Sequence, residues 1–196
     1  MKIFFFSLLF MLTVSISFAQ VKADSSKHLS FKGVPIDGTL IQYVAKMKKS
    51  GFIHISTKDG TAILEGEFAS YKNCFIGVST LKQKDLVSKI VVIFPDRKTW
   101  SSLSSNYFTL KELLTVKYGN PSENIEEFQS YTPDNDGSKF LEVELGACKY
   151  YTIYETEKGT IQLSIEHEGV TSCFVKLAYF DKINNESVKK QALDDL

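Results

Sequence analysis

Histidine and cysteine are the scarcest reactive side chains in this 196-residue chain, which has three of each. The histidines are His28, His54 and His167, and the cysteines are Cys74, Cys148 and Cys173. No two histidines stand four residues apart, and neither an HExxH nor a CxxC motif occurs, so the spacing offers no zinc site. We therefore expect neither a metal nor another cofactor.

The patterns of the common hydrolases are missing as well. The nucleophile elbow of serine hydrolases needs G-x-S-x-G after a strand, and this motif does not occur. A cysteine protease would need one of the cysteines beside His54 or His167, and no local motif supports such a pair. The sequence does not tell which of the 23 acidic residues face each other across a cleft, so a carboxylate-dependent hydrolase stays an open alternative.

The acidic segment 134–137 (Asp-Asn-Asp-Gly) is the nearest approach to a calcium loop. Its spacing does not match the EF-hand pattern, which would require a ligand at Thr132 and a glutamate at Val143. We therefore predict an Asx-type turn between two strands at this place.

The overall charge excludes one class of partner. Basic and acidic residues are balanced at 23 each, whereas nucleic-acid binding needs a strongly basic face. The nearest basic cluster, Lys46, Lys48 and Lys49, ends a predicted helix, where cations complement the helix dipole. We expect no nucleic-acid partner.

The N-terminus has the pattern of a cleavable secretory signal. Lys2 is the only charge in residues 1–19, an apolar run follows from Ile3, and Ser17-Phe18-Ala19 places small residues at the cleavage site. We predict a signal peptide over 1–19, with an uncleaved anchor as the alternative. Because no cysteine lies near the cleavage site and no second apolar span follows, we expect a periplasmic or extracellular protein that has no lipid anchor and no membrane span after cleavage.

Three cysteines in an oxidising compartment allow one disulfide at most. Each cysteine stands in an apolar, strand-like run, so buried free thiols are the favoured interpretation. One bridge, with its pair undetermined, is the alternative.

The elements that would position these side chains begin with a helix in a first unit, residues 31–97. Thr39 and Gln42 match the capping box, and Gly51 suits the left-handed position after a helix. Leu40, Tyr43, Val44 and Met47 repeat at helical spacing between them. The strands expected next span 52–55, 61–64, 73–78 and 86–94. Asp59-Gly60 predicts a hairpin turn, and the last strand is apolar enough to be central and buried on both faces.

The second predicted unit, residues 98–182, repeats this order. Its helical stripe consists of Trp100, Leu103, Tyr107, Leu110 and Leu114, with Trp100 expected in the core. A second capping-box match at Thr109 marks either a break between two helices or a coincidence within one, and Gly119 and Pro121 end the helix. The strands expected next span 140–145, 147–154, 160–165 and 172–180, with a loop at 122–138 and turns at 157–159 and 166–169.

The predicted fold class is therefore α+β, with two tandem helix-then-antiparallel-sheet repeats packed as one unit. The flanking segments are a disordered N-terminal stretch at 20–30, which contains His28, and a polar C-terminal tail at 183–196, for which we predict a loop and a short polar helix.

Residues 31–40, Trp100, Leu103, Tyr107 and the KYGNP segment at 117–121 resemble a group of small, uncharacterised exported proteins of Gram-negative anaerobes. The helix-then-sheet plan is also similar to the beta-lactamase-inhibitor-protein-like architecture. This second resemblance implies a binding or inhibitor-like role, although a fold alone does not fix a function.

Three tyrosines are the candidate binding residues. Tyr150 and Tyr151 must point to opposite sides of a strand, and with Tyr154 they are predicted to contribute to an open sheet face. The favoured function is an exported, non-enzymatic binding or inhibitor-like module for an unknown envelope or extracellular protein or ligand. The alternatives are the carboxylate-dependent hydrolase and a structural component of an envelope assembly.

Overall fold

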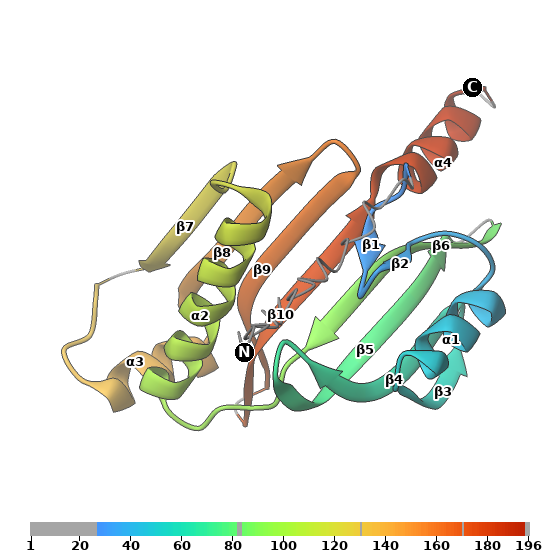
Figure 1. Ribbon diagram of the computed structural model, residues 1–196. Coiled ribbons are helices and arrows are strands. Elements are labelled where there is room, and N and C mark those ends of the chain that lie inside the picture. The colour runs from blue at the N-terminus through green and yellow to red at the C-terminus, as the bar shows by residue number, and fades with distance from the viewer. Residues whose placement is uncertain (1–26, 82–83, 130, 170, 195–196) are drawn as a thin grey trace, which may run out of the picture.

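An eight-stranded antiparallel sheet dominates the computed structural model, which describes residues 27–81, 84–129, 131–169 and 171–194 (Figure 1). The strand order is β3-β4-β5-β6-β10-β9-β8-β7. The strands are β3 (Ile53–Lys58), β4 (Thr61–Phe68), β5 (Tyr71–Leu81), β6 (Lys84–Ile93), β7 (Glu123–Phe128), β8 (Cys148–Thr156), β9 (Gly159–Glu168) and β10 (Ser172–Asp181). A small second sheet pairs β1 (Ser30–Phe31) with β2 (Val34–Pro35).

The helices gather on one face of this sheet. They are α1 (Leu40–Lys49), α2 (Trp100–Tyr118), α3 (Asp136–Glu144) and α4 (Lys182–Asp194). Helix α1 lies over β3 to β6 and α2 over β8 to β10, while α4 continues from the end of β10 (Figure 1). The protein is therefore a mixed α+β fold, as predicted, and no helix of the described residues covers the second face of the sheet.

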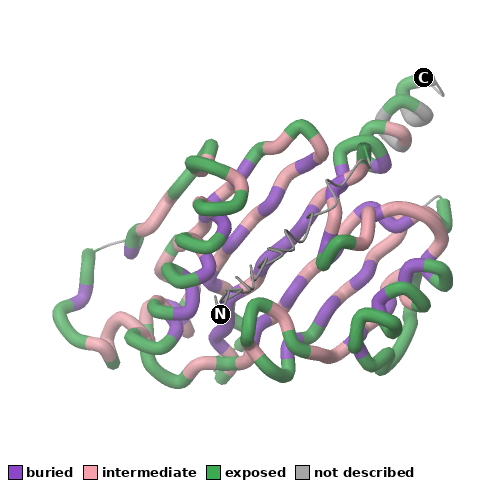
Figure 2. The backbone as a smooth tube through the Cα atoms, viewed as in Figure 1, coloured by how far each residue is buried: buried purple, intermediate pink, exposed green. Residues whose placement is uncertain are grey.

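The core fills the space between the sheet and the helices. Buried residues alternate with half-buried ones along the strands, as Figure 2 shows, because successive side chains point to opposite faces. The helix-facing residues include Ile76, Ile90 and Leu177, all of them buried. The open-face residues between them are mostly half-buried or exposed.

The local predictions for the first helix and hairpin are confirmed. Both hydrogen bonds of the capping box form between Thr39 and Gln42, and Gly51 follows the helix with φ +92°. Asp59 and Gly60 have positive φ angles of 49° and 72°, as a tight turn with right-handed strand twist requires. The sequence therefore determines these elements locally.

Strand β6 lies in the middle of the sheet, but only one of its faces is buried. Ile90 and Val92 are fully buried under the helices, whereas Val91 and Ile93 are half-buried on the other side. The expectation of burial on both faces is wrong because nothing among the described residues covers the second face.

Helix α2 is continuous from its N-cap Thr99 to Tyr118. The capping-box match at Thr109 is therefore a coincidence inside one helix. Trp100 packs against Phe128 and Tyr150 at centroid distances of 5.1 and 5.0 Å, but it is half-buried and lies at the margin of the core rather than inside it.

Two elements between α2 and β8 differ from the predictions. The expected strand at 140–145 is part of α3, and the expected Asx-type turn is its start, where Asn135 Oδ1 accepts from Ser138 N at 2.9 Å. Strand β7 occupies part of the expected loop at 122–138. It was missed because edge strands tolerate polar residues, and its sequence ENIEEF lacks a continuous apolar pattern.

Three smaller outcomes concern the turn at 166–169, the N-terminal stretch and the C-terminal tail. Strand β9 continues to Glu168, through most of that predicted turn. The expectation of disorder is wrong for Leu29, which is buried and donates its amide to Asp181 Oδ1 at 2.8 Å. At the C-terminal end, the predicted polar helix is present as α4, which begins directly after β10 without the expected loop, and its Asn184 is buried.

The predicted signal peptide at 1–19 lies outside the described residues, as does the stretch 20–26. Among the helices that the structure describes, none combines the length and apolarity that a membrane span requires.

Candidate functional site

The open face of the sheet carries a band of small and apolar side chains at its centre. Val91 on β6 stands opposite Gly77 on β5 and Ala178 on β10. In the next row, Ile93 stands opposite Phe75, whose side chain is 46% exposed. A wet face of an antiparallel sheet is normally polar, so this apolar band is the unusual feature of the face.

The band continues to Ile63 on β4, and farther out apolar side chains recur only singly, because Gln162 stands between Ala178 and Ile153 and Glu65 stands between Phe75 and Ile53. Ile63 on β4 pairs with Gly77, and Ile153 on β8 pairs with Gln162 of β9. At the edge, Ile53 on β3 is 65% exposed. The open face therefore presents apolar surface on strands from both halves of the chain.

Charged side chains lie among the apolar ones. Lys176 on β10 forms an ion pair with Glu166 on β9, and the Lys89 ammonium lies 4.9 Å from the centroid of the Phe180 ring. Polar groups that frame an apolar centre are the usual anatomy of a protein–protein interface.

The three predicted tyrosines do not share this face. Tyr154 is buried at 1% exposure on the helix side, and its hydroxyl donates to Lys111 O at 3.0 Å. Tyr150 also points to the helix side, where it packs with Trp100. Only Tyr151 lies on the open side, and its hydroxyl donates to Glu123. The grouping was wrong because Tyr150 and Tyr154, an even number of residues apart on one strand, point to the same face of the sheet, and that face is the one covered by the helices.

Tyr107 shows what the buried polar groups of this half do. Its hydroxyl lies 2.6 Å from Thr152 Oγ1, which in turn donates to Asn124 Oδ1 at 2.8 Å. Glu126 accepts from Tyr107 at 3.2 Å and from Lys111 at 2.5 Å. This network holds α2 against β7 and β8, so it positions the fold rather than forming a site.

The cysteines are all free thiols, as favoured from the sequence, although Cys148 is only half-buried. Burial raises the pKa of the Cys74 and Cys148 thiols to about 11. Burial also raises the pKa of Cys173 above its ordinary value. A nucleophilic cysteine needs a lowered pKa, so the surroundings of these thiols work against cysteine-protease chemistry.

The histidines lie apart from one another. His28 Nδ1 is 3.0 Å from Asp181 Oδ2, and His54 Nε2 is 2.8 Å from Thr57 Oγ1 on the edge strand. His167 is exposed near the end of β9, with Nδ1 at 3.1 Å from Gly169 O. Within the described ranges, no three His, Cys, Asp or Glu side chains lie close enough to share a metal ion.

One hollow of about 270 Å³ near the ends of β8 and β10 contains two carboxylates, Glu155 and Glu186. Both residues are exposed, whereas a catalytic acid at neutral pH needs a desolvating pocket. This arrangement gives no support to the hydrolase alternative.

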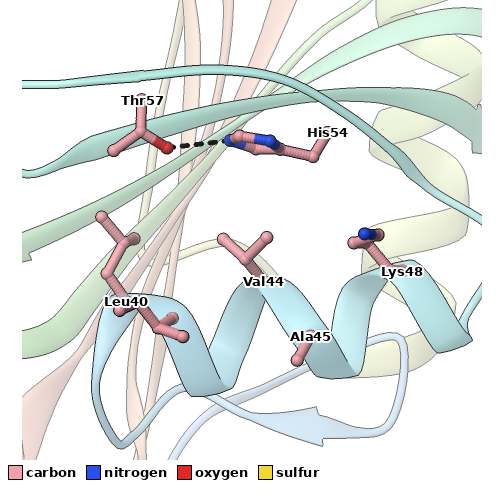
Figure 3. A pocket seen from close by; sticks show the side chains of 7 residues that line it. Leu40, Val44, Ala45, Lys48, His54 and Thr57 are labelled. Atoms are coloured by element: carbon pink, nitrogen blue, oxygen red, sulfur yellow. Dashed lines mark hydrogen bonds between the residues drawn. The ribbon is translucent and has the colours of Figure 1, made fainter.

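A second feature is a groove of about 290 Å³ between α1 and the edge strand β3. Leu40, Val44 and Lys48 point from the helix toward the strand, where His54 and Thr57 face them (Figure 3). The sequence indicated Leu40 and Val44 only as residues of the helix face packed on the sheet. Ile41, which is 80% exposed, lies outside that face, so the groove itself was not predicted.

Comparisons with known proteins give no family for this chain. No protein-family model, curated protein or solved structure matches it.

Proposed function

We propose that this chain is an exported, non-enzymatic protein that binds a folded protein partner through the open face of its sheet. The observation that carries the proposal is the apolar band on that face, in which Phe75 is exposed, Gly77, Val91 and Ile93 are half-buried, and Ala178 is buried beside Val91. Contiguous exposed apolar surface framed by polar groups marks interaction sites. The small side chains at its centre let a partner approach the sheet closely.

The proposal includes a tandem organisation similar to the beta-lactamase-inhibitor-protein-like architecture. Two features of the topology support it. Each half of the chain has a helix followed by four strands, with α3 inserted between β7 and β8. The last strands of the two halves, β6 and β10, pair at the centre of the sheet. In this arrangement both halves contribute to one binding face.

Export is the second part of the proposal. The N-terminal pattern supports it, with Lys2, an apolar run and small residues at Ser17 and Ala19. N-terminal sequencing of the protein from the periplasm or the medium of the producing cell should give a chain starting at Gln20. A start at Met1 would contradict the cleavage.

The binding face can be tested with a pair of matched variants. Val91→Arg places a charge in the middle of the open face, and Val116→Arg places the same charge on the outside of α2, where Val116 is 83% exposed. Envelope proteins captured by the wild-type chain are identified and their affinities are measured by titration with each purified variant.

We expect Val91→Arg to weaken binding by about 100-fold, because an unpaired charge would be buried at the centre of the interface. Val116→Arg should bind like the wild-type chain. Equal affinity of the wild type and Val91→Arg, with both folded by circular dichroism, would refute the proposal, and so would equal losses in the two variants.

A further inference from the structure

The groove between α1 and β3 lies on the helix side of the sheet edge, apart from the open face. Strand β3 is one of the two edge strands of the sheet, and all six of its residues are exposed. An edge strand presents main-chain N–H and C=O groups that can pair with a further strand. The edge at β3 therefore offers main-chain hydrogen bonds next to a side-chain pocket.

The pocket is largely apolar at one end and basic at the other. Leu40 lies toward the Thr57 end of the strand, Val44 lies opposite the His54 ring, and Lys48 lies farther along the helix (Figure 3). Leu40 is largely buried, whereas Ile41 beside it is 80% exposed. A side chain entering the groove would meet aliphatic carbon first and an ammonium group farther along.

The charges around the groove are one-sided. Neither α1 nor β3 contains an acidic residue, and of their lysines Lys48 lines the groove while Lys46, Lys49 and Lys58 lie outside it. The nearby carboxylate of Asp85 accepts from Leu40 N at 2.9 Å, which places it at the opposite end of the groove from Lys48. This charge distribution is complementary to an acidic ligand whose charge lies at the Lys48 end.

We propose that the groove binds an extended peptide segment that adds to β3 as a further antiparallel or parallel strand. Every second side chain of this peptide would face the helix. Those beside Leu40 and Val44 would be apolar, and the one beside Lys48 and His54 would be acidic. Peptide addition to a sheet edge uses main-chain hydrogen bonds for affinity and alternate side-chain pockets for specificity. The site is separate from the open face and does not depend on the function proposed for that face.

The hydrogen bond between His54 and Thr57 supports this geometry. Both side chains lie on the helix side of β3, and the distance of 2.8 Å between His54 Nε2 and Thr57 Oγ1 fixes the imidazole along the wall of the groove. A bulge between His54 and Ser56 interrupts the pairing of β3 with β4. An added strand would therefore match β3 best on either side of this bulge.

Fluorescence polarisation with a defined probe tests the proposal. The probe is a labelled, end-blocked peptide in which two leucines and one glutamate alternate with threonines, made with glutamate near either end because the added strand can run in either direction. We expect one of the two probes to bind saturably to the full chain. Lys48→Glu should weaken that binding by about tenfold, or about 1.4 kcal/mol, and Lys46→Glu, a matched change outside the groove, by less than about twofold.

Two control peptides separate the contributions. Replacing the glutamate by lysine should abolish binding. Methylating the amides on the edge of the peptide that faces β3 should weaken binding by about tenfold or more, because the main-chain hydrogen bonds to β3 are lost. Val91→Arg should leave probe binding unchanged, so a failure of the open-face function and a failure of this groove can be told apart.

Three results would overturn the proposal. These are no saturable binding of either probe, equal losses in Lys48→Glu and Lys46→Glu, and full binding of the methylated peptide. Sedimentation of the free chain adds one more test, since self-association that Lys48→Glu disperses would identify a second copy of the chain as the occupant instead.

Discussion

The carboxylate of Asp181 joins the two ends of the described chain. It is fully buried and accepts from Leu29 N at 2.8 Å and from Asn184 N at 3.0 Å, with His28 Nδ1 at 3.0 Å. Asp181→Ala would leave two buried amides without a partner, each of which costs about 1–3 kcal/mol. We therefore expect the free energy of unfolding to fall by about 4 kcal/mol, a large part of the stability of a domain this size. His28 is left out of this sum because its ring is partly exposed.

Denaturant unfolding followed by the fluorescence of Trp100, the only tryptophan, measures this loss. Asp181→Asn keeps one acceptor oxygen and should lose about half as much as Asp181→Ala. Glu186→Ala removes an exposed carboxylate from α4, the helix that follows Asp181, and should change stability by less than about 0.5 kcal/mol. A loss below about 1 kcal/mol in Asp181→Ala would refute the reasoning.

Three further predictions follow from buried or hydrogen-bonded polar groups. Asn106 is 3% exposed and its side-chain amide lacks a hydrogen-bond partner within the described part of the chain, so Asn106→Leu should raise the free energy of unfolding by about 1 kcal/mol. A lower free energy of unfolding in the same denaturation assay would contradict this. Since burial raises the pKa of Cys74 and Cys148 to about 11, and that of Cys173 above its ordinary value, a thiol reagent at about pH 8 should label these residues only after unfolding. Rapid labelling of the native protein would show the thiols to be accessible. Hydrogen bonds from Ser101 hold the pKa of the Asp136 carboxyl below its usual range. The ionised carboxylate therefore stabilises the folded state fully above about pH 5, and this contribution is lost as the pH falls through the folded-state pKa. The difference in stability between the wild type and Asp136→Asn should shrink below about pH 4, and a difference independent of pH would be the contrary result.

The sequence predicted those elements whose determinants are local. The capping box at Thr39 lies within four residues of the chain, and the turn at Asp59 and Gly60 needs only the conformational freedom of two residues. The helix stop at Gly119 is of the same kind. Such features were confirmed because their hydrogen bonds connect near neighbours.

The failures come from contacts between distant residues. The segment at 140–145 is apolar enough for either a strand or a helix, and α3 forms because Asn135 caps it and it packs against α2 and β9. Leu29 is ordered by Asp181, which is 152 residues away along the chain. No local sequence pattern indicates a contact between residues so far apart along the chain.

The candidate site shows the same division. Because Tyr150 and Tyr151 are neighbours on one strand, the sequence places them on opposite faces of the sheet, but it does not tell which of the two faces the helices cover. The band around Val91 depends on the register of β5, β6 and β10, which the sequence does not specify. The groove at β3 depends on which strand ends at the edge of the sheet.

The most direct test of the central proposal is site-specific photo-crosslinking in the producing cell. A photoreactive amino acid replaces Phe75 on the open face in one variant and Val116 on the outside of α2 in another, both of them exposed positions. The proposed function predicts a discrete adduct with one envelope or extracellular protein from position 75 and none from position 116. Adducts of equal yield from both positions, or an adduct from position 116 alone, would contradict it.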